Sequence, residues 1–204
     1  MTHNLKAFGL AVMAMFAMTA VAASAAQAVE FHSEAAETVL TAKNEAGSNS
    51  VFDAAGASIS CTGATFTGKQ TTATSTEVTV TPAYTGCTFL GVPVTVKING
   101  CEYKFHSSGV VDVVGAACTG ITFEGAGCKV TVGKQNGLKE VTYTNLGSGT
   151  GREVTVTPHV TGISYKSEGL CPKSGTFADG NYTSGNAIVT GENATGGMVG
   201  IWVL

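Results

Sequence analysis

Charged and aromatic residues are scarce in this chain of 204 residues. Asp, Glu, Lys and Arg together make up 12% of it, and Phe, Trp and Tyr make up 7%, with a single tryptophan. The net charge is −3 at neutral pH, which argues against a basic surface for nucleic acid and against a polybasic membrane patch. No window beyond the first 28 residues carries a convincing helical stripe. The composition therefore favours a β protein that does not bind nucleic acid.

Motifs of catalysis and metal binding are also missing from the sequence. There is no G-x-S-x-G nucleophile elbow and no C-x-x-C pair, and the histidines do not stand at ligand spacing from the cysteines. We therefore expect no cofactor, no metal and no enzymatic activity. The remaining hydrolase interpretation would use His106, beside Ser107, or His159 as a base near an acid, inside a concave pocket.

The first segment has the three-part layout of a secretory signal peptide. A short polar start precedes an apolar run from Ala7 to Val21, and Ala26-Gln27-Ala28 provides an A-x-A cleavage site. The run is about 15 residues long, whereas a membrane-spanning helix needs about 20. The pattern predicts a signal peptide over residues 1–28 and a single secreted domain over residues 29–204, without a membrane span after cleavage.

An even number of cysteines in an exported chain is typical of disulfides. Six cysteines allow fifteen connectivities. The positions of the cysteines within two similar segments of the chain favour one of them. The favoured pairs are Cys61 with Cys87, Cys101 with Cys118, and Cys128 with Cys171.

Alternation of apolar and polar residues indicates antiparallel strands with one wet face. Residues 77–81 and 153–157 both read EVTVT, and similar alternation recurs at residues 129–132 and 141–144. Residues 34–42 are also interpreted as a strand. The sequence therefore predicts an all-β, antiparallel, sandwich-like domain stapled by disulfides.

Glycine-containing turns are expected to join these strands. Hairpins are predicted at Asn99-Gly100 and Asp179-Gly180, and residues 129–165 are predicted to form a three-stranded meander through turns at Asn136-Gly137 and 147–151. The last residues are expected to form a strand that docks Trp202 into the core.

Two sequence patterns each occur twice in the chain. Residues 77–89 read EVTVTPAYTGCTF and residues 153–165 read EVTVTPHVTGISY, while a CTG-x-TF pattern occurs near residues 61 and 118. Duplication of one β unit, with halves over about 50–106 and 107–191, is one explanation. Convergence on a good strand sequence is the other.

The combination of FHSE, TVTP-x-YTGCT, NGC-x-Y-x-F, TVTP-x-VTGISY and a terminal GIWV resembles a group of exported, threonine- and glycine-rich actinobacterial proteins with several cysteines. That group carries no assigned function. The resemblance implies export and disulfide bonding, and it implies no activity and no catalytic residue.

The sequence thus favours a non-catalytic β protein outside the cell or at its envelope, either structural or binding an unidentified surface or cell-wall partner. A carbohydrate-binding module and a small secreted hydrolase are the alternatives. Because Tyr182 follows the Asp179-Gly180 turn, it is the tyrosine expected to be most exposed and the candidate for a ligand-binding surface.

Overall fold

Antiparallel strands form nearly the whole structure, a computed structural model that describes residues 29–204 and confirms the all-β class. The predicted signal peptide lies outside the described residues. The first nine strands are β1 (Phe31–Ser33), β2 (Thr38–Asn44), β3 (Ser50–Ala54), β4 (Ala57–Gln70), β5 (Thr74–Ser75), β6 (Glu77–Phe89), β7 (Val92–Pro93), β8 (Thr95–Lys97) and β9 (Glu102–His106). The others are β10 (Val111–Val114), β11 (Ile121–Gly125), β12 (Cys128–Val132), β13 (Gln135–Leu138), β14 (Val141–Leu146), β15 (Glu153–Gly169), β16 (Gly175–Ser184), β17 (Ala187–Glu192), β18 (Met198–Val199) and β19 (Ile201–Val203), and a 3-10 turn (Gly149–Gly151) precedes β15.

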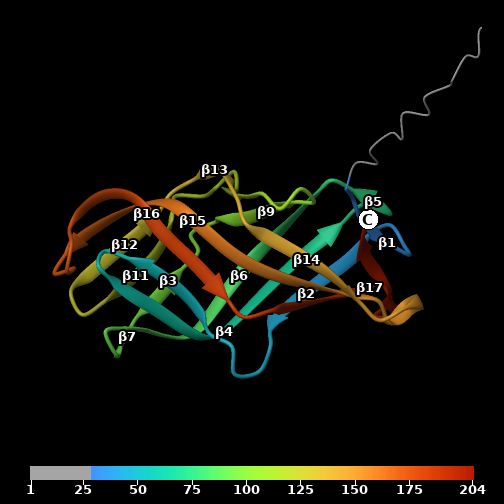
Figure 1. Cartoon of the computed structure of the whole chain (residues 1–204), viewed down its shortest axis with the longest axis horizontal. Helices are drawn as coiled ribbons and strands as arrows, with labels where there is room; N and C mark the ends of the chain where they lie inside the picture. The colour runs from blue at the N-terminus through green and yellow to red at the C-terminus, as the bar shows by residue number, and fades with distance from the viewer. Residues whose placement is uncertain (1–28) are drawn as a thin grey trace, which may run out of the picture.

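Three long strands, β4, β6 and β15, organise the main sheet (Figure 1). The β4 strand pairs with β6 on one side and with β2 and β3, which follow one another along it, on the other. In the same way, β16 and β17 follow one another along β15. The pairs β2–β17 and β3–β16 join these two halves. The long strands β4, β6 and β15 therefore run along the molecule and connect its two ends (Figure 1).

The edges of this sheet return toward each other. At one edge the side chain of Gln135 bonds both the amide and the carbonyl of Ser164 in β15, at 2.8 and 3.1 Å. Nearby, the amide of Val141 donates to the carbonyl of Gly109 at 3.1 Å. These bonds satisfy polar groups at the strand edges and hold the edges near each other. The apolar face of the sheet is thereby enclosed, in a sandwich-like fold.

A glycine with positive φ interrupts the alternation at the same point of both repeated segments. Gly86 in β6 has φ +59° and Gly162 in β15 has φ +72°. A side chain is disfavoured in this region of backbone space, so glycine is the residue that permits the local change of direction. At Gly86 a Cβ atom would also collide with Oγ1 of Thr62.

The neighbours of the two repeated segments differ. In the first half, β4 pairs directly with β6. In the second half, β12 lies between β11 and β15. The two segments thus share a backbone irregularity but occupy different positions in the sheet, and duplication of one unit stays a prediction.

Several predicted connections are wrong. Asn99 and Gly100 do form a turn, with φ +51° and +72°, but β8 pairs with β11 and β9 pairs with β6 and β10. Residues 179–180 lie inside the continuous strand β16, because this strand finds partners in β15 and β3 on its two sides. Of the predicted meander, the hairpin that joins β14 to β15 through residues 147–151 is confirmed. The turn at residues 136–137 is wrong, because these residues lie in β13, and β12 pairs with β15 instead of β14. Of residues 34–42, only the part from Thr38 onward is a strand.

A separate three-stranded sheet, in the order β19-β1-β5, lies at one end of the molecule together with the C-terminus (Figure 1). The predicted terminal strand is present as β19, but the residue that it buries is Ile201, which is 4% exposed. Trp202 is half-buried, stacks on His32 with ring centroids 5.3 Å apart, and lies under the guanidinium group of Arg152. The expectation that Trp202 docks into the core is therefore wrong.

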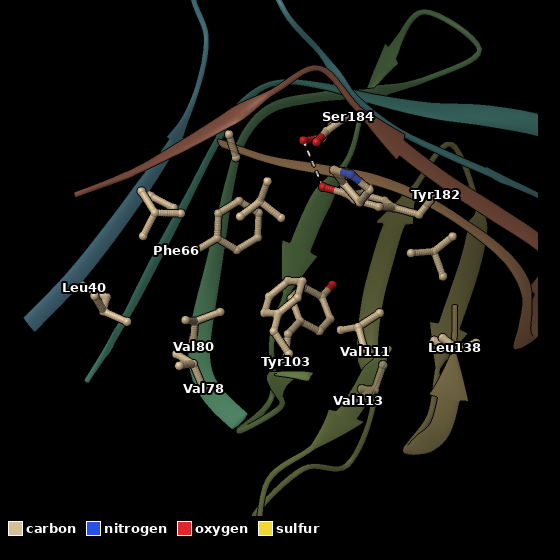
Figure 2. A pocket seen from close by; sticks show the side chains of 18 of the residues that line it. Leu40, Phe66, Val78, Val80, Tyr103, Val111, Val113, Leu138, Tyr182 and Ser184 are labelled. Carbon is tan, nitrogen blue, oxygen red and sulfur yellow. Dashed lines mark hydrogen bonds between the residues drawn. The ribbon is translucent and has the colours of Figure 1, made fainter. Parts of the chain in front are cut away.

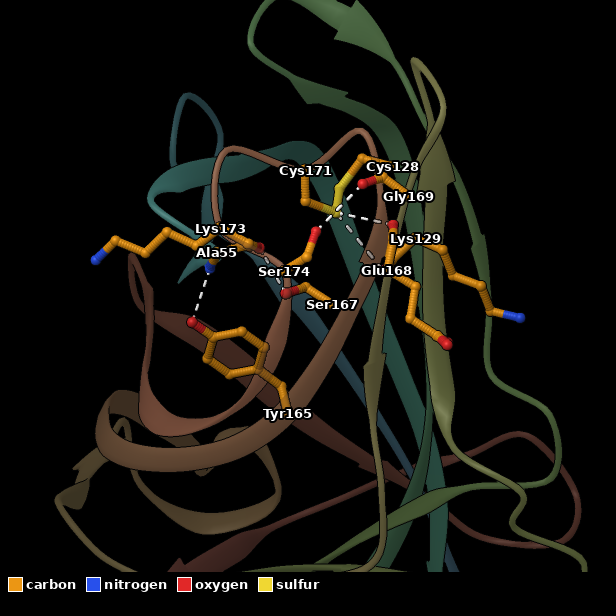
Figure 3. The surroundings of a disulfide bond; sticks show 10 residues. All are labelled: Ala55, Cys128, Lys129, Tyr165, Ser167, Glu168, Gly169, Cys171, Lys173 and Ser174. Carbon is orange, nitrogen blue, oxygen red and sulfur yellow. Dashed lines mark hydrogen bonds between the residues drawn. A yellow bond between two sulfur atoms is a disulfide. The ribbon is translucent and has the colours of Figure 1, made fainter.

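All six cysteines are paired as the favoured scheme predicts: Cys61–Cys87, Cys101–Cys118 and Cys128–Cys171. The first bridge joins residues directly opposite each other on β4 and β6. The third joins the start of β12 to the loop after β15, where the hydroxyl of Ser167 donates to the carbonyl of Lys173 at 2.7 Å (Figure 3). The three bridges close segments with sequence separations of 26, 17 and 43 residues.

Candidate functional site

An apolar cavity of about 150 Å³ lies in the interior, where the two hydrophobic clusters of the core meet. One cluster centres on Ile59, Ile121 and Val130, and the other on Leu40 and Phe66. Residues of both clusters line the cavity, and Figure 2 shows their side chains converging from several strands. Its size matches cavities that hold a benzene-sized molecule in other proteins.

Strand alternation explains why the wall is apolar. Val78, Val80, Pro82 and Tyr84 occupy every second position of β6, and all but Pro82 line the cavity directly. The same face of β15 presents the alternate residues of 154–160. Because successive side chains in a strand point to opposite sides, one uninterrupted face of each long strand borders the space.

Four tyrosines are among the polar side chains of this wall, which also include those of His32, Ser50, Gln70, Ser184 and Trp202. Tyr84 in β6 and Tyr103 in β9 are hydrogen-bonded through their hydroxyl oxygens at 3.0 Å. Tyr182 in β16 donates its hydroxyl to Oγ of Ser50 at 3.1 Å. Burial is the largest cause that raises the pKa of these three tyrosines. Their phenol groups therefore stay neutral and keep their hydrogens at physiological pH.

These three rings are enclosed by protein and yet are not fully covered. Each is deep enough for burial to dominate its pKa, but each keeps part of its surface accessible to a water-sized probe. A close-packed interior would cover such rings completely. All three rings also line the cavity.

Tyr182 was expected on an exposed surface, and this expectation is wrong. Because β16 continues through residues 179–180, Tyr182 keeps the alternation of Gly180 and Ser184, both of which are buried. Its side chain projects into the space that Tyr103 and Phe66 also face (Figure 2). The candidate ligand-binding tyrosine therefore lies in the interior.

The hydrolase interpretation requires a serine, a histidine and an acid in contact. His106 in β9 does lie between two carboxylates: its Nε2 is 2.9 Å from Asp112 Oδ2 and its Nδ1 is 3.3 Å from Glu77 Oε1. Ser107, however, donates its hydroxyl to the carbonyl of Val29. Both imidazole nitrogens thus face acids, and Ser107 is not placed to be activated by His106.

The carboxylate of Asp112 is held in its charged form. Burial alone would raise its pKa, but hydrogen bonds from His106 and from the amide of Gly137, with the charges of His106 and Lys104, lower the pKa below its usual value. The Gly137 amide is 2.7 Å from Asp112 Oδ1. This group of residues links β9, β10 and β13 and is explained by that structural role.

The other two histidines among residues 29–204 are also apart from such an arrangement. His159 is exposed on β15 opposite Thr183, and His32 stacks on Trp202 with its Nε2 3.9 Å from Glu30. Within residues 29–204, no group of three or more His, Cys, Asp and Glu residues could hold a metal ion. No helix in this part of the chain is long and apolar enough to cross a membrane.

A second hollow, of about 300 Å³, is open at the surface beside the turn between β3 and β4. The hydroxyl of Tyr165 accepts a bond from the amide of Ala55 at 2.8 Å and donates to Asp179 at 2.9 Å. The bond to Ala55 is drawn in Figure 3. Polar groups of this second hollow thus bond one another. The interior cavity is therefore the stronger candidate site.

Sequence reasoning missed Tyr84, Tyr103 and Ser50 as members of one site. Tyr84 carries a signal that could have been used, since it continues the inward alternation of Val78 and Val80. The contacts of Ser50 depend on which strands pair, and no local pattern contains that information.

The chain matches no protein-family model, no curated protein and no solved structure. The geometry of the cavity is therefore the main evidence about function.

Proposed function

We propose that this chain is an exported, non-catalytic binding protein that holds a small apolar molecule in its interior cavity. The observation that carries this proposal is a cavity of about 150 Å³ between two hydrophobic clusters, bordered mainly by valine, phenylalanine and tyrosine side chains. Empty apolar space costs stability, because its lining loses dispersion contacts. A bound apolar molecule would recover those contacts.

Export is part of the proposal and is supported by the segment over residues 1–28 and by the three disulfides. Disulfides persist mainly in oxidising compartments outside the cytosol. They also tie together the strands around the interior, so the cavity would keep its shape while the protein is free in the surroundings of the cell.

The carbohydrate-binding alternative has less support. Sugar-binding surfaces on β-sandwiches commonly present aromatic rings to solvent, but all five tyrosines of this chain are at least partly buried. The single tryptophan, Trp202, is covered on its faces by His32 and Arg152.

Titration of the oxidised, isotope-labelled chain with benzene, followed by two-dimensional NMR, tests the proposal. We expect saturable shifts confined to strands that border the cavity, including β6, β9 and β15. Shifts that grow linearly with benzene, or that scatter over the surface, would refute interior binding. Retention on washed cell walls or insoluble polysaccharide at high salt would instead favour the carbohydrate-binding alternative.

A further inference from the structure

Four hydroxyl groups from four different strands gather at the cavity wall. Tyr84 comes from β6, Tyr103 from β9, Tyr182 from β16 and Ser50 from β3, and all four line the cavity. They form two bonded pairs, Tyr84 with Tyr103 and Tyr182 with Ser50. The two pairs are also connected, because a side-chain hydrogen bond between Tyr84 and Tyr182 contributes to the pKa of each.

These pairs do not use all of their hydrogen-bonding capacity. A hydroxyl has one hydrogen to donate and two lone pairs that can accept. The Tyr84–Tyr103 pair shares one hydrogen. Its second hydrogen has an acceptor in the neighbouring hydroxyl of Tyr182, with which Tyr84 also shares a side-chain hydrogen bond. Ser50 accepts bonds from Tyr182 and from Nδ2 of Asn44, the latter at 2.9 Å, and keeps its own hydrogen. The four hydroxyls therefore keep one spare hydrogen, that of Ser50, in an otherwise apolar surrounding.

Other hydroxyls around the cavity are already committed to the backbone. Tyr143 donates to the carbonyl of His106 at 2.9 Å, and Ser184 donates to the carbonyl of Gly185 at 2.8 Å. Among the tyrosine and serine hydroxyls that line the cavity, the free capacity thus lies within the two pairs.

Charge is nearly absent from the cavity wall. Its lining contains no Asp, Glu, Lys or Arg, and the only ionisable side chain besides tyrosine is that of His32 on β1, opposite Trp202 of β19. An ionic ligand would lose its hydration without gaining an opposite charge, which is strongly unfavourable. A neutral oxygen on the ligand would instead find a hydroxyl donor.

We propose that the cavity selects uncharged, ring-sized molecules that carry one hydroxyl or carbonyl oxygen, which the Tyr84–Tyr103 and Tyr182–Ser50 pairs bind while the ring packs against the valines and Phe66. This inference rests on the proposed function and specifies its ligand class. It predicts that an apolar ring alone enters the cavity but gains nothing from the tyrosine hydroxyls.

Toluene and phenol distinguish the two contributions, because they have nearly the same shape and differ in a methyl or a hydroxyl group. Affinities for the oxidised chain are measured by NMR titration. Tyr103→Phe and Tyr182→Phe should each weaken phenol binding by about two- to tenfold, the range expected for one net hydrogen bond. Toluene affinity should stay within about twofold of the original value, since the apolar wall is unchanged.

Tyr143→Phe is the matched control, because it makes the same chemical change at a hydroxyl that is already bonded to the backbone. It should leave the ratio of phenol to toluene affinity unchanged. Urea unfolding of each variant verifies that it is folded, and either Tyr103→Phe or Tyr182→Phe suffices if the other does not fold. Benzoate should not bind the unmodified chain measurably.

The outcomes separate the two proposals. Failure of both toluene and phenol to bind would overturn interior binding and with it this inference. Toluene binding with phenol affinity insensitive to Tyr103→Phe and Tyr182→Phe would overturn only the role of the hydroxyls. Benzoate binding as tight as that of phenol would overturn the selection of uncharged molecules.

Discussion

Val156 provides a direct test of whether the cavity is free space. It lies on β15, borders the cavity and packs against both hydrophobic clusters, while remaining only half-buried. Val156→Ile adds one methylene group and keeps the branched Cβ that suits a strand. The new carbon should enter the cavity instead of displacing a neighbour.

The expected gain follows from the burial of that carbon. Burying one methylene group stabilises a folded protein by about 0.8 kcal/mol when no strain is introduced. We therefore expect Val156→Ile to raise the free energy of unfolding by about 0.5 to 0.8 kcal/mol. It should also weaken benzene binding, because the added carbon and the ligand compete for the same space.

Val130→Ile is the matched control. Val130 lies on β12, is 1% exposed and does not border the cavity. The same added carbon has no free volume there, so the substitution should lower the free energy of unfolding by about 1 to 3 kcal/mol. The two variants thus differ in the sign of their effect.

Urea unfolding of the oxidised chain, followed by circular dichroism, measures both effects. The midpoint should rise for Val156→Ile and fall for Val130→Ile, with similar m values, since the surface exposed on unfolding hardly changes. A loss of stability in Val156→Ile equal to that in Val130→Ile would show that the interior is close-packed, and the argument for a ligand would fail.

Three further predictions concern the framework around the cavity. Replacing Cys128 and Cys171 together by alanine should lower the free energy of unfolding by about 4 kcal/mol, because their bridge closes a segment with a sequence separation of 43 residues; urea unfolding measures this. Tyr165→Phe should cost about 1 to 3 kcal/mol in the same assay, because the amide of the fully buried Ala55 loses its partner. The lowered pKa of Asp112 implies stabilisation that is present above about pH 4 and is lost as the pH falls through the lower folded value. Melting temperatures of Asp112→Asn should therefore fall less steeply between pH 4 and pH 2 than those of the original chain.

Strand alternation and cysteine spacing were the parts of the fold that the sequence predicted well. The repeated EVTVT segments became the starts of β6 and β15, because one apolar face of each must be buried. The pairing of Cys61 with Cys87 followed from placing both on neighbouring strands of one unit, which the register of β4 and β6 confirms.

Pairing between strands was predicted less well, because a turn signal specifies local backbone and not a partner. Asn99-Gly100 adopts the positive φ values that its sequence favours, yet the strands on either side find partners elsewhere. At Asp179-Gly180 the pairing of β16 with both β3 and β15 outweighs the local preference for a turn. Each strand edge gains several hydrogen bonds from such pairing, whereas a turn gains one or two.

The cavity itself depends on a quantity that no single segment contains. Its volume is the difference between the space that the strands enclose and the summed volume of side chains from β2, β6, β9, β15 and their neighbours. The sequence does contain one indication of the site: Tyr84 and Tyr103, which have polar hydroxyl groups, stand at positions that alternation assigns to the apolar interior. Phenylalanine would fill such positions without a hydroxyl to satisfy. Two phenols placed inside, bonded to each other within a group of four hydroxyls that keeps one spare hydrogen, are the feature on which the proposal of a ligand oxygen rests.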